Sequence, residues 1–131
     1  IGFKVYPSLK DKKKSTLEID GLAWGSDVLY VIESKVWDIK SFFEHKKIHL
    51  YRERDLKGIV DGKSYTEGKP PKDIPNLVEK IEYIKKDIEK YCPDFSNIKE
   101  IKGLIITKSH PPIKEYKGIK IISLEDITNL N

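Results

Sequence analysis

The chain has almost no sulfur and no long apolar run. Its 131 residues include one cysteine, Cys92, and no methionine. A single cysteine excludes an internal disulfide, which is typical of proteins kept in a reducing cytoplasm. No stretch approaches the ~20 apolar residues that a membrane-spanning helix needs. We therefore expect a cytoplasmic protein that does not cross a membrane.

Several other residue types are scarce. Glutamine is absent, Ala23 is the only alanine, and Arg52 and Arg54 are the only arginines. A charged, glutamine-poor composition is typical of thermophile proteins, although codon bias in an AT-rich genome explains it equally well. The 25 basic and 21 acidic residues leave a net charge of +4. This mild excess allows a polyanionic partner such as nucleic acid but does not require one.

The length indicates one domain over residues 1–131, because a chain of this size can bury a single core. The sequence begins at Ile1 rather than at methionine. We therefore expect a domain excised from a longer protein, with a covalent partner domain upstream of Ile1.

The apolar pattern predicts an α/β fold with a mixed sheet whose antiparallel part comes first. Expected strands cover residues 1–9, 15–24, 28–37, 101–107 and 118–123. Expected helices cover 38–55, 76–91 and 124–131, and the glycine- and proline-rich segments 57–75 and 109–117 are expected to be loops.

The segment 17–37 holds the most unusual pattern, since charged residues interrupt two strand-like apolar runs. If the turn is the two-residue Ser26-Asp27, antiparallel partners have numbers that add up to 53. Asp20 then lies opposite Glu33 on one face, with Cβ atoms ~4.5–5.5 Å apart. An odd-length turn would put the two carboxylates on opposite faces.

Two carboxylates at that distance can share a divalent cation such as Mg²⁺ or Mn²⁺, which prefers oxygen ligands and also binds substrate phosphate. Lys35 is one pleat beyond Glu33 and faces the same side, where it can orient water or neutralise charge on a phosphate. The chain holds eight other acid-x-lysine triplets, so the triplet alone carries no weight. Only the triplet Glu33–Lys35 lies at the end of an apolar run. Only this triplet also has an acidic residue, Asp20, at a position in the preceding strand that can face it.

The same register supports a second interpretation. It puts Glu18 opposite Lys35, so the charged residues can also be ordinary cross-strand ion pairs on a solvated face, each contributing ~0–1 kcal/mol. From the pattern alone the two interpretations are about equally supported.

The stretch EID…VLYVIESKVWDIKSFFEHKKIHLY resembles the PD-(D/E)XK, or restriction-endonuclease-like, nuclease superfamily. It is particularly similar to archaeal nuclease-fold proteins in which the E-x-K strand runs into a helix. The residues of that helix here are Asp38, Ile39, Phe42 or Phe43, Lys46 or Lys47, and Tyr51. The resemblance covers residues 15–51 and extends more loosely to the strands LIIT and GIKIIS.

The resemblance implies an αβββαβ core, with the first helix missing from this chain, and Mg²⁺-dependent endonuclease cleavage of DNA. Asp20 and Glu33 would bind the metal, and Asp20, Glu33 and Lys35 would carry the catalysis. Superfamily members often add a glutamate from an upstream helix, and here Glu18 is the candidate for that acid. A homodimer is also implied, because such nucleases often pair to cut two strands.

Basic residues near the hairpin are candidates for DNA contacts. The superfamily also includes proteins that do not cleave, and a fold does not fix a function. The alternative is therefore a non-catalytic nuclease-fold domain for DNA binding or protein assembly. The candidate contact residues are Lys12, Lys13, Lys14, Lys46 and Arg52.

Overall fold

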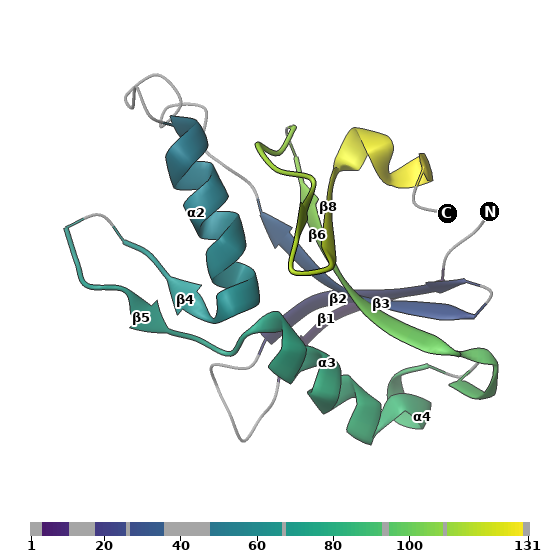
Figure 1. The fold of residues 1–131 in the computed structure, drawn as a ribbon. Coiled ribbons are helices and arrows are strands. Elements are labelled where there is room, and N and C mark those ends of the chain that lie inside the picture. The colour runs from purple at the N-terminus through teal and green to yellow at the C-terminus, as the bar shows by residue number, and fades with distance from the viewer. Residues whose placement is uncertain are drawn as a thin grey trace.

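A mixed six-stranded sheet forms the centre of the molecule (Figure 1). The computed structural model describes residues 4–10, 18–25, 27–35, 48–66, 68–92, 95–108 and 110–129. The strand order is β1-β2-β3-β6-β8-β7. The chain is therefore α/β with a mixed sheet, as the pattern predicts.

The antiparallel half of the sheet comes first in the chain. It consists of β1 (Lys4–Lys10), β2 (Glu18–Gly25) and β3 (Val28–Lys35), each antiparallel to the next. The parallel half follows, because β6 (Glu100–Thr107) pairs with β3 and β8 (Ile119–Ser123) pairs with β6, both in parallel. The strands predicted at 101–107 and 118–123 are confirmed.

The central strands are apolar on both faces, as strands of a covered parallel sheet are. On β6 the consecutive residues Leu104 and Ile105 are both buried although they point to opposite faces. Ile105 pairs with Ile121 of β8, which is also buried. Both faces of the sheet are therefore buried along its central strands.

The first described helix, α2 (Ile48–Asp61), corrects the predicted end of the helix at 55 and the predicted loop from 57. Gly58 lies inside α2, at a place that requires glycine because a Cβ there would stand 2.4 Å from the carbonyl oxygen of Lys63. The helix stops at Gly62, whose φ of +84° favours glycine. The part of the predicted helix at 38–47 lies outside the described residues.

The segment after α2 holds a small second sheet within the predicted loop. It pairs β4 (Lys63–Ser64) with β5 (Lys72–Asp73) in antiparallel fashion. Two-residue strands carry no apolar alternation, so their sequences gave no strand pattern to detect.

The next helix is α3 (Leu77–Lys86), which Asn76 caps by accepting a hydrogen bond from the N–H of Glu79 at 2.8 Å. The predicted single helix 76–91 is wrong in one respect, because Asp87 (φ −131°, ψ 42°) interrupts it. A short helix, α4 (Ile88–Tyr91), follows. The apolar stripe of α3 packs on β3 and β6.

The C-terminal region corrects two more expectations. The predicted loop 109–117 contains β7 (Glu115–Tyr116), which forms a hairpin with β8 through Lys117 and Gly118, both with positive φ. The predicted helix 124–131 is a 3-10 helix, η2 (Leu124–Asn129). Another 3-10 turn, η1 (Phe95–Asn97), precedes β6.

Candidate functional site

The β2–β3 hairpin has the register that the two-residue turn predicts. Its paired residues run from Gly25–Val28 to Gly21–Ile32, and the numbers of every pair add up to 53. The ladder ends at Gly21–Ile32, while β2 continues to pair with β1 as far as Glu18–Lys10. Asp20 and Glu33 are therefore the first residues beyond the last backbone pair of the β2–β3 ladder.

The Asp20 side chain bridges the strands at the end of this ladder. Its Oδ2 accepts a hydrogen bond from the backbone N–H of Ser34 at 2.8 Å and from the Ser34 hydroxyl at 3.2 Å. Asp20 is exposed. Its carboxylate is thus fixed at the surface while one side remains open to solvent.

Glu33 is the buried member of the pair, with 8% of its surface exposed. Burial raises its pKa from 4.5 to about 7, because a carboxylate loses hydration in a dry environment. The Lys80 ammonium opposes this rise, and the negative charge of nearby Asp20 adds to it. Two acids so near that the charge of one raises the pKa of the other, with one of them buried, are an arrangement typical of functional sites.

The direct partner of Glu33 is Lys80, a residue that the sequence analysis did not single out. Lys80 Nζ donates to Glu33 Oε1 at 2.6 Å, and the two side chains are 11% and 10% exposed. Lys80 reaches Glu33 from α3, which crosses β3 and β6. This is a buried ion pair between a helix and the sheet.

A signal for Lys80 was present in the sequence. It lies three residues after Leu77 and four before Ile84, on the apolar stripe of the helix, and all three residues are buried. A lysine in such a stripe needs a buried acidic partner. Periodicity can identify the lysine in this way, but it cannot identify which acid it meets.

Lys35 and Glu18 do not form the cross-strand ion pair that was the alternative interpretation. The β2–β3 ladder ends at Gly21–Ile32, before it would reach Glu18 and Lys35, and the backbone of Glu18 is paired only on the β1 side within the described residues. Lys35 is half-buried and pairs with Thr107 of β6. By strand alternation its side chain points to the same face as Glu33.

The site lies toward the carboxyl ends of three parallel strands. Glu33 is paired with Ile105, and the next row contains Lys35, Thr107 and Ser123. Thr107 and Ser123 are buried polar residues in this row, and the Ser123 hydroxyl donates to Asp126 at 2.9 Å. In open α/β sheets ligands bind at this edge.

Asp20 and Glu33 fit a Mg²⁺ or Mn²⁺ ion, since such ions keep several waters and take only one or two protein carboxylates together with substrate phosphates. The described residues contain no cluster of three or more histidine, cysteine, aspartate or glutamate side chains. A structural zinc site of three or four such ligands is therefore absent from this part of the chain.

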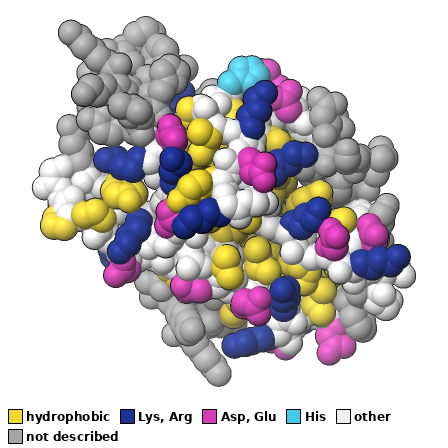
Figure 2. All heavy atoms as spheres, in the orientation of Figure 1, with side chains coloured by type: hydrophobic (Ala, Val, Ile, Leu, Met, Phe, Trp, Pro, Cys, Tyr) yellow, Lys and Arg dark blue, Asp and Glu magenta, His cyan; other side chains and the backbone are white. Residues whose placement is uncertain are grey.

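Of the five candidate DNA-contact residues, the structure describes Arg52. Lys12, Lys13, Lys14 and Lys46 lie outside the described residues. Arg52 is in α2 and is 9% exposed, which leaves little of its side chain for a nucleic-acid contact. Figure 2 shows basic and acidic side chains interspersed on the face toward the viewer rather than gathered into one patch.

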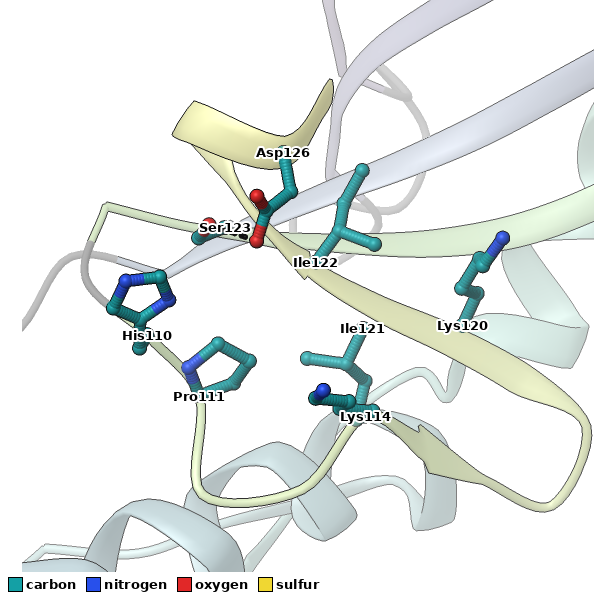
Figure 3. A pocket seen from close by; sticks show the side chains of 8 residues that line it. All are labelled: His110, Pro111, Lys114, Lys120, Ile121, Ile122, Ser123 and Asp126. Atoms are coloured by element: carbon teal, nitrogen blue, oxygen red, sulfur yellow. Dashed lines mark hydrogen bonds between the residues drawn. The ribbon is translucent and has the colours of Figure 1, made fainter. Parts of the chain in front are cut away.

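A pocket of about 420 Å³ lies beside β8 and the loop that precedes β7 (Figure 3). Asp126 and Ser123 meet at one end of it, and His110 lies beside Ser123 on the loop, while Lys120 lies toward the other end. The pocket contains none of Asp20, Glu33, Lys35 and Lys80. Its lining residues are His110, Pro111, Lys114, Lys120, Ile121, Ile122, Ser123 and Asp126.

Comparison of the chain with known protein families, with curated proteins and with solved structures finds no match. None of the described helices is both long enough and apolar enough to cross a membrane.

Proposed function

We propose that this chain is a PD-(D/E)XK-type nuclease domain that hydrolyses DNA phosphodiester bonds with Mg²⁺ or Mn²⁺. The observation that carries the proposal is the place of Asp20 and Glu33 directly after the last pair of the β2–β3 ladder, near enough that the charge of Asp20 raises the pKa of Glu33. The resemblance of residues 15–51 to this superfamily supports the same assignment.

Each residue of the site has a distinct role in the proposal. Asp20 and Glu33 bind the cation, which would supply Lewis-acid polarisation of the phosphate and an activated water. Asp20 is held by Ser34, so its carboxylate is oriented in advance. Lys35, one pleat from Glu33, orients the attacking water and offsets negative charge that develops on the phosphate.

Glu18 has a secondary role in this proposal. It precedes Asp20 by two residues on β2 and is exposed. By alternation it points to the same face as Asp20. We assign it to the outer rim of the site, where it would bind water around the cation.

A cleavage assay with supercoiled plasmid and Mn²⁺ tests the proposal. We expect wild-type protein to nick or linearise the plasmid, and we expect Asp20→Asn and Lys35→Met each to lower the rate at least ~100-fold, the scale on which charge-stabilising groups act. Both positions are at least partly exposed, so the variants should fold.

Lys102→Met is the matched control, because Lys102 is an exposed lysine on β6 whose partner is Glu100. It should cleave like wild type. Cleavage that survives Asp20→Asn and Lys35→Met at the wild-type rate would contradict the assignment of these residues.

The second candidate is a non-catalytic nuclease-fold domain that binds DNA or another protein. The buried Lys80–Glu33 ion pair favours it, because this pair satisfies the Glu33 carboxylate without a metal. This candidate predicts a folded protein with no Mn²⁺-dependent cleavage of any DNA substrate. The plasmid assay therefore separates the two functions.

A further inference from the structure

Lys80 is the one charged residue on the buried stripe of α3. The other members of the stripe, Leu77, Ile81 and Ile84, are all buried and apolar. An ammonium in such a position is costly unless a carboxylate accepts its hydrogen bond. Glu33 is that carboxylate, at 2.6 Å.

The position of Lys80 has a consequence for any cation that binds Glu33. A divalent ion on this carboxylate would stand within a few ångströms of the ammonium, and like charges at that distance repel strongly in a dry environment. The ion and Lys80 therefore compete for Glu33. The ammonium is tethered to α3, so once displaced it remains beside the site.

We propose that Lys80 is a positioning residue of this site: it holds Glu33 before a metal binds and gives way to the divalent cation when one does. This inference rests on the proposed function, because it takes Glu33 to be a metal ligand.

Within the described residues no ion pair joins Lys35 to Glu33, so the charge that competes with a cation is that of Lys80. A protein without the Lys80 charge should therefore bind a divalent cation more tightly.

The test measures binding of Mn²⁺ alone by electron paramagnetic resonance, with no nucleic acid present. We expect Lys80→Met to bind Mn²⁺ about tenfold more tightly than wild type, the change that ~1.4 kcal/mol produces. Lys85→Met is the matched control on the same helix, because Lys85 is exposed and pairs with Glu82. It should bind Mn²⁺ like wild type.

A second measurement uses wild-type protein and does not depend on how a variant folds. The ammonium of Lys80 is buried and hydrogen-bonded, so its ¹⁵N-detected NMR signal should be protected from exchange with water. Addition of Mg²⁺ should shift or remove this signal at the concentration at which Mg²⁺ binds.

The outcomes separate this inference from the proposed function. Equal or weaker Mn²⁺ binding by Lys80→Met, or a Lys80 signal that Mg²⁺ leaves unchanged while it binds, overturns the inference and leaves the nuclease proposal standing. If neither wild type nor Lys80→Met binds Mn²⁺, Glu33 is not a metal ligand, and both proposals fail. Tighter binding by Lys80→Met without plasmid cleavage supports the inference and contradicts the nuclease activity.

Discussion

At the scale of single residues, Glu33 carries a carboxyl group in a place from which water is nearly excluded. Burial raises the pKa of this group to about 7, even though Lys80 opposes the change. The site therefore holds a carboxyl whose charge state changes near neutral pH. Asp20, exposed and bound to Ser34, is its solvated neighbour.

This raised pKa makes the stability of the metal-free protein depend on pH. The folded protein holds the Glu33 proton more tightly than the unfolded chain, whose pKa is near 4.5. The stability contributed by Glu33 is therefore fully present below pH 4.5 and is lost as the pH rises to about 7. Glu33→Gln removes this titration.

Urea unfolding in EDTA between pH 4 and pH 8 measures the effect. The free energy of unfolding of wild type, minus that of Glu33→Gln, should fall by roughly 3 kcal/mol across this range. A difference that stays flat with pH would show that burial does not raise the pKa of Glu33.

The sequence was informative about Asp20 and Glu33 because a two-residue turn fixes which residues of a hairpin face each other. All of the information lies within 14 positions of the chain. Lys80 could not be assigned to Glu33 in this way, because it is 47 positions away and its contact depends on how α3 crosses the sheet. Long-range contacts of this kind follow from packing rather than from local pattern.

At the scale of elements, α3 contributes Lys80 to the site because the helix packs close to β6 and β3. This approach is possible at Gly103, where a Cβ would stand 2.6 Å from Leu77 Cδ2 and 2.9 Å from Ile119 Cδ1. Gly103 is paired with Val31, two residues before Glu33 on β3. The absence of a side chain at Gly103 therefore allows α3 to pack close to the sheet, and this close packing lets the Lys80 side chain extend to Glu33.

Gly103→Ala tests this packing. The added methyl group must push Leu77 and Ile119 aside, so we expect a loss of ~1–3 kcal/mol in the free energy of unfolding. Val78→Ala is the control on the same helix, since Val78 is 55% exposed. Its effect should stay within ~0.5 kcal/mol. Equal stability of Gly103→Ala and wild type in urea unfolding would contradict the close packing.

The helices were predicted less well than the strands, for local reasons. Gly58 suggested a loop, yet it lies in α2, where glycine is needed because the backbone at Lys63 leaves no room for a side chain. The interruption between α3 and α4 occurs at Asp87, and no proline or glycine at this point of the sequence indicates that the helix breaks. In contrast, the run at 101–107 is largely apolar, which is the pattern of a central parallel strand.

At the scale of the whole molecule, the sheet changes from antiparallel to parallel at β3. This strand pairs with β2 on one side and with β6 on the other, so Glu33 and Lys35 lie where the two halves meet. The order of strands and helices in the sequence was enough to predict a mixed α/β sheet. It was not enough to predict β4, β5 and β7, which have two residues each and are held by their partners.

The central claim is that Asp20 and Glu33 bind one divalent cation that displaces Lys80. The most direct test is a crystal of the protein soaked in Mn²⁺, with anomalous diffraction data. We predict a manganese peak within about 2.2 Å of a carboxylate oxygen of each acid, and a Lys80 Nζ that no longer contacts Glu33. A site without manganese, in which Lys80 Nζ still donates to Glu33 Oε1, would contradict the account.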